Sequence, residues 1–180
     1  MTIDRGAAGN YAVAISGGTI LVTASGDGID ANGALSMSGG TLVIQGPTAN
    51  NNGALDYDRS FELTGGLLVA AGSAGMAQGP GTGSTQASVH VRFASVQAAG
   101  SIVSIKPAGG EEVVTVRVAK AFQSLVVSSP KLVASQVYDV CTGGSASGSE
   151  LNGLFTGGSH SGGTKTGTAT AALVIPRTGR

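Results

Sequence analysis

The residues that could carry chemistry in this sequence are mostly carboxylates, gathered in two short motifs. Asp27 and Asp30 lie in the run GDGIDAN, and Asp56 and Asp58 lie in the run LDYD. Asn32 occupies the place in the first motif that Asp58 occupies in the second. No histidine or cysteine lies near either motif, and oxygen-only ligand sets suit Ca²⁺ rather than zinc. The residue types therefore favour a calcium site formed by Asp27, Asp30, Asn32, Asp56 and Asp58.

A repeat in the first half of the chain predicts that the two motifs are stacked. Glycine pairs occur at 17–18, 39–40 and 65–66, which are 22 and then 26 residues apart, with alternating apolar residues on both sides. Such alternation is typical of strands, and the period is typical of one rung of a parallel β-helix. Aligning the pairs places Asp30 over Asp56, on strands about 4.8 Å apart. Two carboxylates at that separation repel each other unless a cation lies between them.

Each of these interpretations has a simpler alternative. The carboxylates could be solvated turn residues, because Asp and Asn are common in turns beside glycine. A sandwich built from hairpins would also explain the alternation, but it does not explain the constant register of the repeat. We therefore predict an all-β protein whose residues 1–85 form a few rungs of a parallel β-helix.

The composition agrees with a chain made of short strands and many turns. Glycine supplies 31 of the 180 residues, the hydrophobic share is 41%, and no tryptophan occurs. The hydrophobic share excludes a disordered polymer, and the absence of a Gly-X-Y period excludes collagen. For residues 86–180 we predict an antiparallel meander and a tail that pack on the end of the β-helix. Its expected strands are 88–95, 101–106, 112–118, 124–128 and 136–141, followed by a loop over 143–167 and a last strand at 171–175.

Charge and targeting signals narrow the classes of function. Residues 1–85 hold six acids and two bases, whereas 86–180 hold eight bases and four acids, which cancel overall. No basic face suited to nucleic acid is evident. The sequence contains no apolar run of about 20 residues, so no transmembrane helix is predicted, and no signal peptide is visible. We expect an extracellular or cell-surface protein, present here as a mature form or a fragment.

Two residues beside the carboxylates are candidates for contact with a ligand. Tyr57 could stack on a sugar ring, although it could equally cover the edge of the core. Arg59 is the only lysine or arginine between residues 6 and 91, and a calcium-dependent polysaccharide lyase would need such a base. As the strand neighbour of Asp58, Arg59 should point to the opposite face, which weakens the lyase interpretation.

Several motifs resemble a family of secreted bacterial β-helix proteins that are described as carbohydrate-binding-domain-containing and share the architecture of pectate lyases. The resemblance covers nearly the whole chain and corresponds to the C-terminal portion of those proteins. It implies a right-handed parallel β-helix, bound calcium at Asp27, Asp30, Asn32, Asp56 and Asp58, and binding of polygalacturonate-like polysaccharide or cellulose. The matching segments are 15–33, 46–58, 137–144 and 153–158.

The sequence thus predicts a non-catalytic, calcium-binding protein that binds acidic polysaccharide outside the cell. The alternative is a self-assembling filament or matrix protein, because the first rung would leave an unpaired edge around residues 13–22 with Ile15, Ile20 and Val22 turned inward. Residues 1–14 offer little sequence to cover that edge, so a homo-oligomer could form through it.

Overall fold

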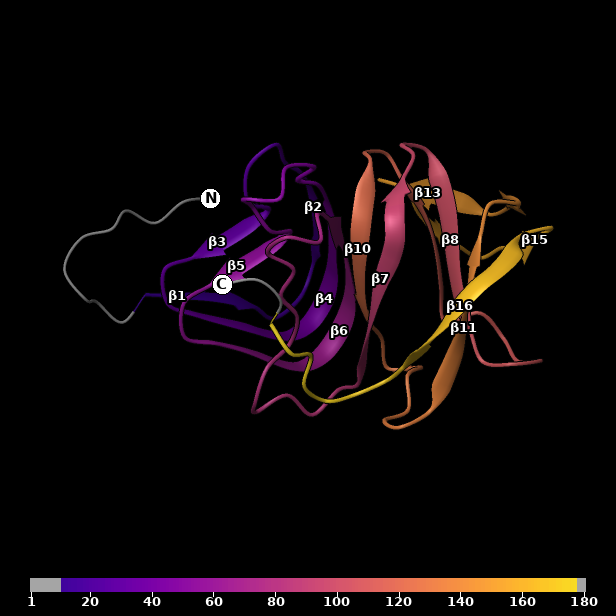
Figure 1. Cartoon of the computed structure of the whole chain (residues 1–180). Helices are drawn as coiled ribbons and strands as arrows, with labels where there is room; N and C mark the ends of the chain where they lie inside the picture. The colour runs from indigo at the N-terminus through magenta and orange to yellow at the C-terminus, as the bar shows by residue number, and fades with distance from the viewer. Residues whose placement is uncertain (1–10, 178–180) are drawn as a thin grey trace.

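The protein is built from strands alone in the part of the chain that the structure describes. This structure is a computed structural model, and it describes residues 11–177 (Figure 1). The all-β prediction is therefore confirmed. The strands are β1 (Ala12–Ile15), β2 (Thr19–Thr23), β3 (Ile29–Ala31), β4 (Ala34–Gln45), β5 (Leu55–Tyr57), β6 (Ser60–Gly72), β7 (Ser88–Gln97), β8 (Ser101–Lys106), β9 (Val114–Val118), β10 (Phe122–Ser128), β11 (Val137–Thr142), β12 (Ser145–Ala146), β13 (Ser149–Leu151), β14 (Leu154–Thr156), β15 (His160–Ser161) and β16 (Thr164–Thr170).

The strands of the repeat pair in parallel and in the register that the glycine pairs predict. Strands β1 and β2 both pair with β4, and β4 pairs with β6. Ile15 lies opposite Met37, which lies opposite Leu63. Strand β3 pairs in parallel with β5, which brings Asp30 opposite Asp56. The predicted alignment of the two carboxylates is confirmed.

Glycine is required where the long strands turn between their two halves. The second glycine of each pair has a positive φ, which is 84° at Gly40 and 95° at Gly66. A Cβ atom at Gly66 would lie 2.7 Å from the carbonyl oxygen of Gly40, and one at Gly40 would lie 2.7 Å from the carbonyl oxygen of Gly18. Neither the backbone angle nor the space accommodates a side chain. The stacked corners therefore depend on these glycines.

The second half of the chain extends the first sheet and adds another. Strand β10 pairs antiparallel with β6, and β7 pairs antiparallel with β10, so the resulting six-stranded sheet is mixed. A second sheet has the order β13-β14-β9-β8-β11-β16, and its pairs are antiparallel. The five strands predicted between 88 and 141 are found as β7 to β11. They are divided between two sheets instead of forming one meander, because β10 returns to the edge of β6.

The prediction for the C-terminal tail was wrong in both of its parts. Strands β12 to β16 lie between 145 and 170, where a loop was expected, and 171–175 contains only a bridge from Ala172 to Ser88. Low apolar content suggested a loop, but these strands are mostly exposed and need few apolar residues. Glycines with positive φ supply the tight turns between them, namely Gly143, Gly144, Gly148, Gly153, Gly157 and Gly162.

The mixed sheet is covered on both faces, and this explains its long apolar runs. On one face of the sheet, Leu42 and Ile44 of β4 belong to the same core cluster as Leu55 and Tyr57 of β5. The residue between them, Val43, belongs to a separate cluster shared with the second sheet. All three β4 side chains are fully buried. Strands covered on both faces are nearly continuous in hydrophobicity, as this segment is.

The first edge of the mixed sheet differs in part from expectation. Ile15 is buried, and Val22 is half-buried against the same core, as predicted. Ile20 was expected to point inward, but 36% of its surface is exposed, and Leu21 beside it is 41% exposed. Residues 1–10, part of the segment expected to leave this edge uncovered, lie outside the described residues.

Candidate functional site

The paired strands β3 and β5 hold two carboxylates side by side. Leu55 and Tyr57 of β5 are buried in the core beneath, whereas Asp56 between them is only half-buried. Alternation along a strand turns neighbouring side chains to opposite faces, so Asp56 and its partner Asp30 lie on the outer face. These two short strands thus place two acids at the distance between adjacent strands.

Further oxygen-bearing side chains surround this pair. The Asp27 carboxylate, in the turn before β3, accepts a hydrogen bond from the backbone N–H of Gly53 at 2.7 Å. Gln78 donates to the Asp56 carboxylate at 2.8 Å from the loop after β6. Asn32 and Asp58 follow the ends of β3 and β5. Within residues 11–177, no three His, Cys, Asp or Glu side chains already form a compact metal-binding group.

Burial and the neighbouring carboxylates both act on Asp30. Its partial burial raises its pKa above the ordinary value of 3.8, and the charges of Asp27, Asp56 and Asp58 raise it further. Three of the other predicted calcium ligands therefore lie within electrostatic reach of Asp30. Because the neighbouring charges disfavour the ionised form of Asp30, a bound cation would stabilise its carboxylate. Carboxylates, an amide and backbone carbonyls are the ligand types that Ca²⁺ takes.

Both residues predicted to contact a ligand line one pocket of about 250 Å³. The pocket lies between the turn from β5 to β6, residues 81–82 and the C-terminal segment 174–177. Arg59 is exposed in that turn, and the prediction that it is a strand neighbour of Asp58 is wrong. Arg177 also lines the pocket, so two guanidinium groups border it. No local pattern in the sequence could bring Arg177 to Arg59, since their proximity depends on the path of the whole chain.

Tyr57 is more enclosed than a sugar-stacking residue would be. Its side chain is only 3% exposed, and its hydroxyl donates a hydrogen bond to the carbonyl of Gly79 at 2.7 Å. The Arg177 guanidinium carbon lies 4.2 Å from the centre of its ring. Burial raises the pKa of Tyr57, and Arg177 partly opposes that shift. A sugar that stacks on Tyr57 would have to displace Arg177, whereas its carboxylate could bind Arg177 where it lies.

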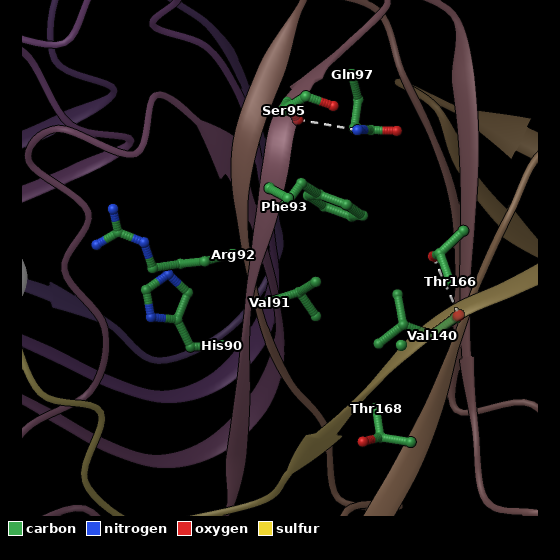
Figure 2. Close-up of a pocket in the computed structure, with 11 residues that line it drawn as sticks. His90, Val91, Arg92, Phe93, Ser95, Gln97, Val140, Thr166 and Thr168 are labelled. Carbon is green, nitrogen blue, oxygen red and sulfur yellow. Dashed lines mark hydrogen bonds between the residues drawn. The ribbon is translucent and has the colours of Figure 1, made fainter.

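A second pocket, of about 350 Å³, lies between β7 and β16. Figure 2 shows Val91 and Phe93 of β7 pointing toward β16, while His90 and Arg92 point to the other side of the strand. Burial lowers the pKa of His90, and the charge of Arg92 lowers it further. His90 lies 2.9 Å from the Ser124 hydroxyl, through its Nε2 atom. This pocket could not be predicted from the sequence, because its walls come from two sheets whose packing no local pattern predicts.

Comparisons with known proteins give no independent indication of function. No protein-family profile matches the chain, and no curated protein or solved structure matches it significantly. Among residues 11–177, no helix is long and apolar enough to cross a membrane. The chemistry of the carboxylate cluster and of the two pockets is therefore the basis for the proposals that follow.

Proposed function

We propose that this protein is a non-catalytic, calcium-dependent binder of acidic polysaccharide, of the polygalacturonate type, that acts outside the cell. The observation that carries the proposal is the in-register pair of Asp30 and Asp56, with Asp27 and Asp58 close enough to raise the pKa of Asp30. Calcium bound between the carboxylates would remove this repulsion. It would also leave coordination positions that a uronate carboxylate can fill, because Ca²⁺ takes six to eight oxygen ligands.

We also propose that the described part of residues 1–85 forms a short right-handed parallel β-helix. The parallel pairs β1–β4, β2–β4, β4–β6 and β3–β5 support it, because they repeat one arrangement along the chain. The loop after β6 continues along β6 itself, where Gly81 and Thr85 donate backbone hydrogen bonds to the carbonyl groups of Phe61 and Leu63. In this arrangement the carboxylate pair forms a ladder on one outer face.

The arginine pocket favours an acidic over a neutral polysaccharide such as cellulose. Arg59 and Arg177 border a space of about 250 Å³, and no Asp or Glu among the described residues lines it. Arginine binds carboxylates in a planar, bidentate geometry that is stronger than a hydrogen bond between neutral groups. Because Asp58 immediately precedes Arg59, one uronate chain could contact the calcium site and the pocket together.

Binding without cleavage is the expected result with polygalacturonate and calcium. The protein should be retained by the insoluble polymer, and no unsaturated product absorbing in the ultraviolet should form. Arg177→Ala should weaken binding by about tenfold, the effect of losing one charge-assisted contact. Arg117→Ala is the matched control, because Arg117 pairs with Glu150 on β13, away from the pocket.

Two outcomes would contradict this prediction. Steady growth of ultraviolet absorbance that disappears in Arg59→Ala would identify a calcium-dependent lyase instead. Equal retention of wild type on polygalacturonate with and without calcium would show that polysaccharide binding does not depend on calcium at the carboxylate cluster.

Self-assembly is a second candidate, favoured by the exposed apolar side chains of β2. Ile20 and Leu21 are 36% and 41% exposed, and within residues 11–177 β2 pairs only with β4. Edge strands of this kind can pair with another chain. Light scattering at micromolar concentration should then report oligomers that Leu21→Lys dissociates. A monomeric wild type would reject this candidate.

A further inference from the structure

The outer edge of β7 pairs with another segment only at its first residue, Ser88, among the described residues. Ser88 donates to the Ala172 carbonyl at 2.8 Å and accepts a hydrogen bond from the Ala172 N–H at 2.8 Å. Residues that exchange both bonds alternate along an antiparallel strand, so the backbone groups of His90 and Arg92 point to this same edge. Strand β16, which precedes Ala172 in the chain, lies near β7 but pairs with β11. Among the described residues, no strand therefore forms a ladder with this edge of β7.

The pocket between β7 and β16 lies beside this open edge. Val91 and Phe93, on alternate positions of β7, face it together with Val140 and Thr168 (Figure 2). A strand added to β7 would turn every second side chain toward that space. Strand addition to an edge, with a pocket that selects alternate side chains, is an established mode of peptide recognition. The part of the pocket bordered by Val91, Phe93 and Val140 therefore suits an apolar side chain.

The charges around the edge indicate which peptide fits. Arg92 lies on the opposite side of β7 from Val91 and Phe93, and within residues 11–177 no Asp or Glu lines the pocket. Side chains of an added strand that do not enter the pocket would lie beside Arg92, so acidic residues are favoured there. A second copy paired through its own β7 would bring two Arg92 side chains together, and like charges across strands are destabilising.

We propose that the outer edge of β7 binds an extended peptide of another protein by strand addition, with an apolar side chain in the β7–β16 pocket and acidic side chains beside Arg92. This site is separate from the proposed polysaccharide site. Either one can therefore fail without the other.

A labelled peptide of sequence Thr-Asp-Val-Asp-Leu-Asp-Val-Thr provides the direct test, by fluorescence polarisation with the full chain. The peptide should bind saturably. Methylation of the peptide nitrogens that face β7 should weaken binding by about tenfold or more, because each methyl group removes a donor of one backbone hydrogen bond. Replacing the three aspartates with lysines should weaken it as well.

Two protein variants test the same site, each with a matched control. Thr168→Tyr fills the pocket from an exposed position and should reduce peptide affinity about tenfold, whereas Thr164→Tyr, on the same strand outside the pocket lining, should not. Arg92→Glu should weaken binding of this peptide and strengthen binding of its lysine version. Lys131→Glu, at an exposed residue after β10 that does not line the pocket, should do neither. Equal binding of the methylated peptide, no effect of Thr168→Tyr, or displacement of the peptide by oligogalacturonate would overturn the proposal.

Discussion

Replacing Asp30 with asparagine is expected to stabilise the calcium-free protein and to abolish most of its stabilisation by calcium. Burial and the charges of Asp27, Asp56 and Asp58 raise the pKa of Asp30 in the folded state. The folded state therefore holds the Asp30 proton more tightly than the unfolded state. Consequently, the stability contributed by this group is present at low pH and is lost as pH rises from about 4 through the raised pKa. An asparagine side chain at this position carries no charge, so the variant escapes that penalty at pH 7.

Thermal unfolding in a chelator and in calcium measures both effects. At a calcium concentration 100 times its dissociation constant, the wild type should gain about 2.7 kcal/mol. Asp30→Asn should show a higher transition temperature than wild type in the chelator and little further increase in calcium. Glu111→Gln, at an exposed residue before β9, is the control and should retain the full calcium effect. If calcium and chelator give the same transition for wild type, the carboxylates are solvated turn residues.

Replacing Gly66 with valine is expected to reduce the free energy of unfolding by roughly 2–5 kcal/mol. Its φ of 95° costs a residue with a side chain about 1–2 kcal/mol, and overpacking adds about 1–3 kcal/mol. The overpacking is against backbone, because the Gly40 carbonyl oxygen and the Gly39 carbonyl carbon lie within 2.9 Å of the new Cβ atom. Such atoms cannot move aside without disturbing the pairing of β4 with β6.

Two other glycines separate the contributions of angle and space. Gly100 has a φ of 83° but nothing within 4 Å of an added Cβ atom, so Gly100→Val should lose only the conformational part. Gly17 is equally open and has no positive φ, so Gly17→Val should leave stability nearly unchanged. Chemical denaturation distinguishes the three variants. Equal losses at Gly66 and Gly100 would show that the stacked corner contributes nothing beyond its backbone angle.

The parts of the molecule that repeat could be predicted from the sequence. The glycine pairs mark equivalent positions, and core residues such as Met37 and Leu63 pack only if those positions align. One register satisfies both requirements, so the opposition of Asp30 and Asp56 follows from the repeat alone. Local alternation likewise located β7 to β11, because each of these strands contributes alternating apolar side chains to the same core.

What could not be predicted depends on contacts between distant segments. Nothing near β10 indicates that it pairs with β6, and without that pairing neither the division into two sheets nor the β7–β16 pocket can be inferred. Arg177 reaches Tyr57 only because the tail crosses the molecule after Ala172. The tail strands escaped detection because exposed strands do not need an apolar face. Ile20 was expected to point inward because it aligns with the buried residues Leu42 and Leu68, but it is exposed at the edge of the sheet.

The most direct test of the calcium proposal is a crystal structure determined in calcium, with anomalous scattering used to locate the ion. We predict density between the carboxylates of Asp30 and Asp56, with oxygen ligands at about 2.3–2.6 Å and further ligands drawn from Asp27, Asn32 and Asp58. Density should vanish from crystals of Asp56→Ala grown under the same conditions. Carboxylates that bind only water at saturating calcium, or an ion held elsewhere in the molecule, would contradict the proposal.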